Sequence, residues 1–406
     1  MTLKEIFKDI FQLLFNNVFQ ITYGILTGII IARTLGPEQM GAYAMAITLV
    51  ITTAQLGSFQ MQTSNMVLAA KNRELIGYLI ANSLVHALSV SVFIVIIMLL
   101  IKNYFPHLNP LTPTMLWLCM ATIPFSLAAT ILKGILLGLK CIPLVIRIEI
   151  TAKLMAASLL VAGLFLKMIT AQAALALYLF ATSVIFCSFL WSLLAQVKKT
   201  PQFSFHHFHH SLSRSTRLFL FNGLTQLLDF FDLYTVQLLL GATLTGFYSL
   251  GQGVQNLILV LPLAIEKALI PRLSARESRM NSWQLTKFFA MAFAGVGAIL
   301  IVLEFFFLGP LINFIYGDKF LPATQIVFML SIAALLSGIA NTFLCHLLPK
   351  KIPNMFILLW GFIILAKILF SWMTLQRWGV FMAAGSTLTA QMILLSMTVF
   401  YASRKR

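Results

Sequence analysis

Long apolar blocks separated by short polar connections make up almost the whole chain. A bilayer core about 30 Å thick requires roughly 20 apolar residues per helix, and each block is about that long. Continuously apolar runs such as Val90–Ile101 exclude the alternating pattern of a membrane β-strand, so helices remain. The pattern predicts twelve membrane-spanning helices, at residues 14–33, 42–65, 75–101, 114–137, 144–167, 171–195, 215–240, 247–270, 286–308, 322–348, 353–375 and 379–401.

Composition and charge agree with this pattern. Of the 406 residues, 60% are hydrophobic and only 10% are charged, whereas soluble domains carry roughly 25% charged residues. When the termini and alternate connections are assigned to one side, nineteen of the 28 Lys and Arg residues collect there, against five on the other side. The positive-inside rule then places both termini in the cytoplasm. The net charge of +17 is therefore mostly a topology signal, and it requires no nucleic acid partner.

The chain also contains an internal repeat. Its longest polar connection, 197–214, predicts an N-terminal six-helix lobe at 1–200, a cytoplasmic inter-lobe loop at 201–213 and a C-terminal six-helix lobe at 214–406. An even number of spans in each half makes the two repeats parallel, as in many transporters. The glycines of the repeated motif suit tight turns between helices. At an offset of 205 residues, Leu35, Gly36, Gly41 and Tyr43 match Leu240, Gly241, Gly246 and Tyr248.

Charged residues inside the predicted spans are the best functional candidates, because each costs at least ~2.5 kcal/mol at the centre of a membrane helix. Asp229 and Asp232 lie one helical turn apart on one face. Two such carboxyl groups can take up a proton or a cation during transport. Alternatively, one of them pairs permanently with Lys367 and stabilises the second half. Lys367 could instead face a central cavity and attract a phosphate.

A second charged group lies near the cytoplasmic end of the span at 144–167. Glu149 and Lys153 have the i, i+4 spacing of a local ion pair. The functional alternative is a basic rim in which Arg147 and Lys153 receive an anionic head group. Both interpretations remain open at this stage.

No metal site or resident cofactor is expected. The four cysteines have no CxxC spacing, and the histidines at 206, 207, 209 and 210 fit no established zinc pattern. Nucleotide-binding and hydrolase motifs are absent from the sequence in any usable context. The chain is therefore expected to be a transporter without catalytic residues rather than an enzyme.

Three segments resemble a known family. Residues 31–46 (IARTLGPEQMGAYAMA) look like the connection between the first two helices of the O-antigen type polysaccharide flippases, in the multidrug/oligosaccharidyl-lipid/polysaccharide (MOP) exporter superfamily. Residues 238–257 (LLLGATLTGFYSLGQGVQNL), which follow Asp232, resemble the seventh and eighth helices of that family. Residues 308–323 (LGPLINFIYGDKFLPA) resemble its connection from helix nine to helix ten.

The resemblance implies a two-lobed, MATE-like all-α membrane protein of the bacterial cytoplasmic (inner) membrane. It implies an alternating-access flippase for undecaprenyl-diphosphate-linked oligosaccharide, such as the O-antigen unit of lipopolysaccharide, driven by a proton or sodium gradient. Lipid-linked oligosaccharide and membrane lipids are the implied partners, with polysaccharide assembly proteins as further candidates. Family members commonly have basic cavity residues, and Lys153 and Lys367 are the nearest candidates here.

Two alternatives remain open. A cation-coupled multidrug antiporter of the same superfamily would be expected to have a dominantly acidic cavity. A membrane-embedded glycan polymerase or ligase would be an enzyme with a large outer loop, and no predicted outer loop exceeds about a dozen residues.

Overall fold

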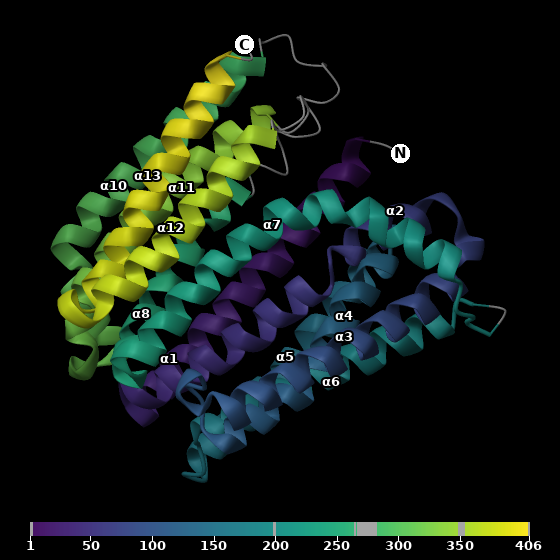
Figure 1. The fold of residues 1–406 in the computed structure, drawn as a ribbon, viewed down its shortest axis with the longest axis horizontal. Coiled ribbons are helices and arrows are strands. Elements are labelled where there is room, and N and C mark those ends of the chain that lie inside the picture. Colours follow the sequence, from purple (N-terminus) through teal and green to yellow (C-terminus); the bar gives the residue numbers. More distant parts are fainter. Residues whose placement is uncertain (1–2, 198–199, 264, 266–281, 348–353, 405–406) are drawn as a thin grey trace. The chain divides into compact units, whose positions relative to one another are not determined.

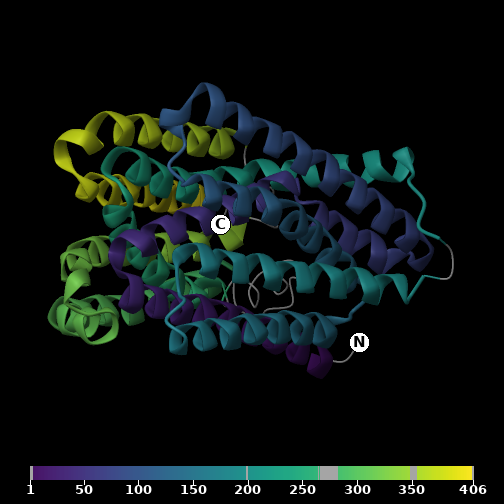
Figure 2. The ribbon, with the colours of Figure 1, turned by 90° about the horizontal axis from the view of Figure 1, so that it is seen from below.

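A computed structural model describes residues 3–197, 200–263, 265, 282–347 and 354–404. Almost all of these residues are helical, and the described ranges contain no β-strand (Figure 1, Figure 2). Short 3-10 turns η1 (Arg73–Leu75), η2 (Pro106–Leu108) and η3 (Asp318–Ala323) join some of the helices. The helices are α1 (Leu3–Gly57), α2 (Met61–Lys71), α3 (Ile76–Tyr104), α4 (Pro113–Gly138), α5 (Ile142–Phe165), α6 (Ala171–Leu194), α7 (Phe205–Leu240), α8 (Ala242–Ile258), α10 (Ser282–Tyr316), α11 (Thr324–Leu347), α12 (Asn354–Trp378) and α13 (Val380–Arg404).

The described residues of all twelve predicted apolar blocks are mostly helical, whereas residues 264, 266–270, 348 and 353 of these blocks lie outside the described residues. Within the described residues, eight segments are long and apolar enough to cross a membrane, and the first of them, Leu14–Gly57, contains one predicted block and most of the next. Three further blocks lie on α5, α7 and α8, which are shorter or carry more polar side chains. The predicted all-α, multi-pass membrane fold is confirmed, and the count of twelve crossings is roughly supported.

Glycine and threonine mark several helix boundaries. Gly36 interrupts α1 with a φ of 83°, and Gly241 precedes α8 with a φ of 88°. This left-handed backbone region carries no steric cost for glycine, so the chain can end one helical run and begin the next. At the start of α4 and α6, the Thr112 and Thr170 hydroxyl groups accept hydrogen bonds from the backbone amides of Met115 and Ala173.

The described chain divides into two compact units. Unit 1 contains residues 1–16 and 42–234, and unit 2 contains residues 17–41 and 235–406. Each long helix α1 and α7 therefore contributes to both units. The division into transport lobes at 1–200 and 214–406 stays a prediction, since compactness alone does not define the parts that move.

Unit 1 has a core centred on α4. The side chains of Leu132, Ile135 and Leu136 are fully buried there, together with Phe189 and Leu193 of α6. Glycines allow α2 to approach α4 closely, because a Cβ atom on Gly134 would lie 2.7 Å from the carbonyl carbon of Gln62. This close helix contact resembles the small-residue packing of membrane helices.

Within the predicted inter-lobe segment at 201–213, α7 already begins at Phe205, so most of this segment is helical. Local hydrogen bonds in unit 1 explain the difference. The Asn82 side chain donates to the Ser204 carbonyl at 3.1 Å and accepts from the Ser204 amide at 3.0 Å. Further along α7, the Ser211 hydroxyl donates to the Asn65 side chain at 2.8 Å. The polar residues therefore form buried contacts with α2 and α3.

Unit 2 is built around α11, which packs against α8, α10 and α13. Small buried side chains line these contacts, including Ala333 and Ala334 of α11 and Ala383 and Ala384 of α13. Such residues let helix backbones approach one another where lipid supplies no hydrophobic driving force. Many large apolar side chains on the outer faces of α10 and α12 are exposed, as expected for surfaces covered by lipid.

Candidate functional site

A buried carboxyl group in unit 1 joins three helices. Glu149 of α5 is only 8% exposed. Its Oε1 atom lies 2.6 Å from the Lys133 Nζ atom of α4, and its Oε2 atom accepts a hydrogen bond of 2.6 Å from the Asn16 side-chain amide of α1. Both carboxylate oxygens thus have a partner, which is the usual condition for a charge retained between apolar helices.

Two cations surround this single anion. Lys153 lies one turn after Glu149 and interacts electrostatically with both Glu149 and Lys133. The Lys133 side chain is 33% exposed, so its ammonium group contacts the buried carboxylate while remaining accessible. The cluster carries one negative and two positive charges, and the surplus positive charge can attract an anionic ligand.

The sequence analysis included Glu149 and Lys153 but missed Lys133 and Asn16. The predicted local pair of Glu149 with Lys153 is only part of the arrangement, since Glu149 also forms an ion pair with Lys133 on another helix. The available sequence signal for this ion pair was a lysine within the apolar block of α4. Its partner Glu149 lies sixteen residues further along the chain, on another helix. Arg147, the other basic-rim candidate, has an exposed side chain.

The acidic candidates of α7 lie near the end of unit 1. Asp232 is 4% exposed, whereas the side chain of Asp229 lies outside the described residues. One turn beyond Phe230, the Tyr234 hydroxyl donates to the Leu108 carbonyl at 2.7 Å. The rings of Phe230 and Tyr234 also stack at 5.6 Å. This part of α7 therefore combines a buried carboxyl group with ring and hydrogen-bond contacts of its neighbours.

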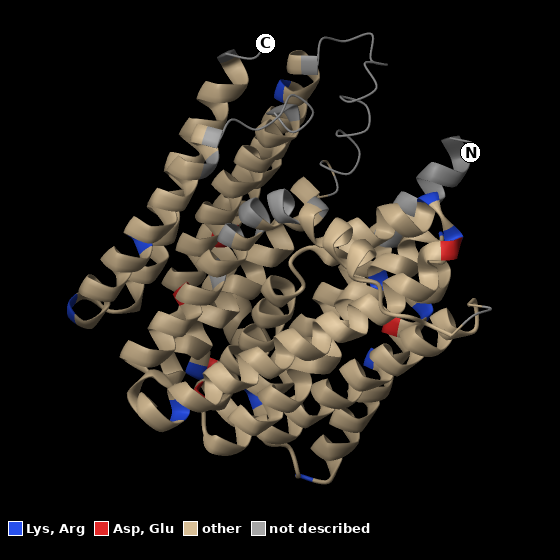
Figure 3. Cartoon of the chain, turned by 45° about the vertical axis from the view of Figure 1, so that its right-hand side comes forward, with Lys and Arg blue, Asp and Glu red and all other residues tan. Residues whose placement is uncertain are grey.

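Lys367 lies in a polar strip of unit 2. It is 5% exposed in the middle of α12, and Ser371 follows one turn later. The hydroxyl groups of Ser371 and Ser386 lie 3.0 Å apart, and those of Tyr248 and Thr387 lie 3.2 Å apart. Buried hydroxyl groups from α8, α12 and α13 therefore lie in the same unit as Lys367. Charged residues such as this lysine are sparse along the helices, as Figure 3 shows.

The repeated glycine motifs contact each other within unit 2. A Cβ atom on Gly41 would lie 2.7 Å from the Gly246 amide nitrogen, and one on Gly246 would lie 2.9 Å from the Pro37 carbonyl carbon. The positive φ angles of Gly36 and Gly241 occur at matching positions of the two motifs. Tyr248 is fully buried, whereas its counterpart Tyr43 is partly exposed. These residues have a structural role in the described fold.

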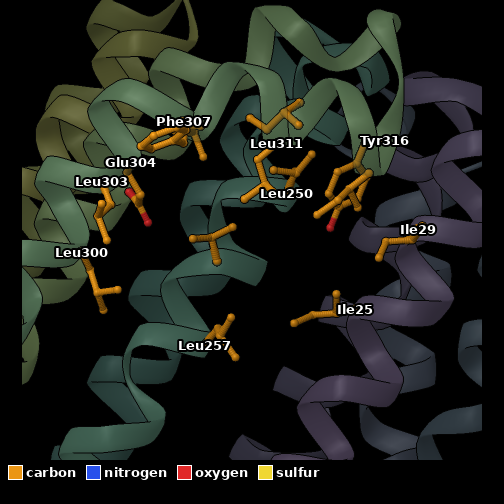
Figure 4. Close-up of a pocket in the computed structure, with 14 residues that line it drawn as sticks. Ile25, Ile29, Leu250, Leu257, Leu300, Leu303, Glu304, Phe307, Leu311 and Tyr316 are labelled. Carbon is orange, nitrogen blue, oxygen red and sulfur yellow. The ribbon is translucent and has the colours of Figure 1, made fainter.

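An apolar pocket of about 360 Å³ also lies in unit 2 (Figure 4). Residues of α1, α8 and α10 line it, and most of them are leucine, isoleucine or valine. The two residues with polar groups in the lining are Glu304 and Tyr316, both of α10. Figure 4 shows the Glu304 carboxyl group pointing into the pocket. The sequence analysis did not select Glu304 as a site residue.

Searching the described residues finds no group of three or more His, Cys, Asp or Glu side chains arranged to hold a metal ion. The four histidines at the start of α7 are partly engaged in ring contacts, such as His207 with Tyr78 at 5.2 Å. All four cysteines are free thiols.

The fold is similar to several solved membrane transporters. The lipid II flippase MurJ in an inward closed conformation matches with a TM-score of 0.75 at 15% identity, covering 96% of this chain and 87% of that chain. An inward-facing MATE family multidrug transporter of the MOP superfamily matches with a TM-score of 0.72 at 14% identity, covering 94% of this chain and 93% of that chain. An outward-facing MATE family multidrug transporter of the same superfamily matches with a TM-score of 0.66 at 13% identity, covering 98% of this chain and 95% of that chain.

These similarities show that the chain has the fold of these solved membrane transporters. The family model described as "Polysaccharide biosynthesis protein" matches residues 6–276. The chain belongs to this family of polysaccharide biosynthesis proteins. No curated protein sequence matches the chain.

Proposed function

We propose that this protein is a flippase that moves a lipid-linked oligosaccharide across the bacterial inner membrane by alternating access. The cargo is an undecaprenyl-diphosphate-linked repeat unit of a surface polysaccharide, such as the O-antigen of lipopolysaccharide. Both termini lie in the cytoplasm, where assembly proteins deliver the finished unit. Family membership and a transporter fold support this proposal.

The observation that carries the proposal is the charge cluster of Lys133, Glu149 and Lys153 between otherwise apolar helices. A diphosphate carries negative charge that hydrocarbon alone cannot accommodate. Two lysines beside one buried glutamate provide a net positive site for that group. Glu149 holds Lys133 through an ion pair at 2.6 Å, so the cluster is ordered before cargo arrives.

Energy coupling is assigned to Asp229 and Asp232. Asp232 is buried near the end of α7, and a carboxyl group inside a membrane protein commonly marks an ion pathway. A proton or sodium ion taken up by this pair would change the charge of α7 during the transport cycle. Lys367 is a second cationic group for the cargo phosphate, as the sequence resemblance implies.

The test is the location of lipid-linked glycan in a strain that lacks this gene and any redundant flippase. We expect the glycan to accumulate on the cytoplasmic face and the surface polysaccharide to disappear. Complementation with Lys153→Ala should restore little transport, whereas Lys319→Ala should restore it fully, because Lys319 is exposed in η3 outside both charge groups. Normal surface glycan in the deletion strain would overturn the proposal.

The alternative within the superfamily is a cation-coupled multidrug antiporter. It predicts drug sensitivity of the deletion strain with unchanged surface polysaccharide. The same strain therefore separates the two functions.

A further inference from the structure

The apolar pocket of unit 2 contains a carboxyl oxygen without a hydrogen-bond partner. Glu304 Oε2 is buried, and the described residues provide it with no partner. Ser331 of α11 lies beside the carboxyl group, yet its hydroxyl oxygen also lacks a hydrogen bond of normal geometry. Lipid is the medium around α10, so the absence of a partner is energetically costly when the carboxyl group is ionised.

The rest of the pocket suits a hydrocarbon chain. Its volume of about 360 Å³ falls within the roughly 300–1,000 Å³ of typical ligand pockets. Ile25 and Ile29 of α1 line one side, and Leu250 and Val254 of α8 line another. Leu303 of α10 is 47% exposed and also lines the pocket, so the pocket is accessible from the outer face of unit 2.

We infer that this pocket binds the isoprenoid chain of the lipid carrier, and that the chain enters when Glu304 is protonated. The inference rests on the proposed flippase function and adds a site for the part of the cargo that stays in hydrocarbon. Glu304 as a whole is still partly exposed, although its Oε2 atom is buried. A chain that fills the pocket removes the rest of this side chain from water, so a neutral carboxyl group binds the chain better than an ionised one. Loss of the proton then favours release of the chain.

The aliphatic lining favours a chain over a lipophilic cation. Cations are usually held against aromatic faces, whereas Phe307 and Tyr316 are the two aromatic residues among the fourteen that line the pocket. The two ligands also predict opposite pH dependence. An isoprenoid chain should bind better at low pH, and a cation should bind better when Glu304 is ionised.

Other titratable groups near Glu304 are few. Tyr316 is the second titratable residue of the lining, and α1 and α8 contribute apolar side chains to it. Asp318 and Lys319 of η3, which packs against α10, are exposed. Ser331 is the polar neighbour from α11. A pH effect on chain binding that disappears in a Glu304 variant can therefore be assigned to Glu304.

The test uses the purified full-length protein in nanodiscs and a polyprenyl monophosphate that carries a photoreactive group at the end of its chain. We expect crosslinks to α8 and α10 that are stronger at pH 5.5 than at pH 8. Val254→Trp should fill the pocket and lower crosslinking about tenfold, equivalent to about 1.4 kcal/mol. Val302→Trp is the matched control, because Val302 is 57% exposed on α10 and does not line the pocket.

Glu304→Gln should retain crosslinking and lose its pH dependence. This variant keeps the shape of the side chain, and so it tests the inference even if Val254→Trp does not fold. Equal crosslinking in wild type and Val254→Trp would overturn the inference. So would the binding of a tetraphenylphosphonium probe that increases at high pH and is lost in Glu304→Gln.

Failure of the inference and failure of the proposed function can be told apart. If the deletion strain accumulates lipid-linked glycan but the probe does not label the pocket, the protein is a flippase that holds the chain elsewhere. If the probe labels the pocket but surface glycan is normal in the deletion strain, the protein binds isoprenoid chains without translocating the glycan, and the proposed function fails.

Discussion

Gly41 and Gly246, at matching positions of the two sequence repeats, pack so closely that a Cβ atom on Gly41 would lie 2.7 Å from the Gly246 amide nitrogen. The repeat therefore has a direct structural consequence, because its two copies form a contact with each other. Gly36 and Gly241 turn the chain within each copy, with φ angles of 83° and 88°. The shared spacing of the two motifs places both small residues at the contact.

We predict that Gly41→Ala and Gly246→Ala each destabilise the protein by about 1–3 kcal/mol, because the added methyl group meets backbone atoms that cannot move aside easily. Thermal unfolding of the detergent-purified protein would measure this. Gly253→Ala on the same helix α8 is the control, since no atom lies within 4 Å of its would-be Cβ atom. Equal melting temperatures for Gly246→Ala and Gly253→Ala would contradict the contact.

The Lys133–Glu149 ion pair should be energetically coupled. Glu149→Gln leaves the Lys133 ammonium group without its anion, and Lys133→Met leaves the buried carboxylate without its cation. We expect a double-mutant cycle for unfolding to give a coupling energy of about 0.5–3 kcal/mol. The partial exposure of Lys133 places the result toward the lower part of this range. Strictly additive effects of the two changes would refute a direct interaction.

Asp232→Asn and Asp229→Asn should abolish gradient-driven transport while leaving folded protein in the membrane. The reason is that an amide cannot release a proton or neutralise a cation at neutral pH. Surface polysaccharide and protein abundance, measured in the same complemented strains, check this prediction. Loss of folded protein would instead favour the permanent pair with Lys367 that the sequence leaves open.

Asn82→Ala should loosen the start of α7. The Asn82 side chain makes two hydrogen bonds to the Ser204 backbone, at 3.0 and 3.1 Å. Their loss should raise amide hydrogen exchange over residues 204–212 by severalfold, because one of the bonds protects the Ser204 amide directly. Asn72→Ala serves as the comparison, since Asn72 is exposed and its side chain accepts from the nearby Glu74 amide. Unchanged exchange at Ser204 would rule out this role.

Much of the fold could be predicted because the signal for a membrane helix is local. Apolar blocks of the length of a bilayer, such as Ile76–Tyr104, leave the backbone no alternative to helix formation. The segment that begins at Phe205 was predicted less well. Its polar side chains look solvated in sequence, but Ser204 and Ser211 form hydrogen bonds with Asn82 and Asn65, which precede them by more than a hundred residues.

The sequence by itself determined that this protein is helical, multi-pass and built from two related halves, because length, hydropathy and the glycine repeat are local properties of the chain. Only the tertiary structure decided which charges interact. Glu149 has a near neighbour in Lys153, yet its ion pair is with Lys133 and its second oxygen accepts from Asn16. In the sequence, Glu304 looks like an ordinary charge near a helix end. The tertiary structure places it in an apolar pocket to which α1 and α8 contribute. Partners across helices depend on packing, which no spacing along one helix specifies.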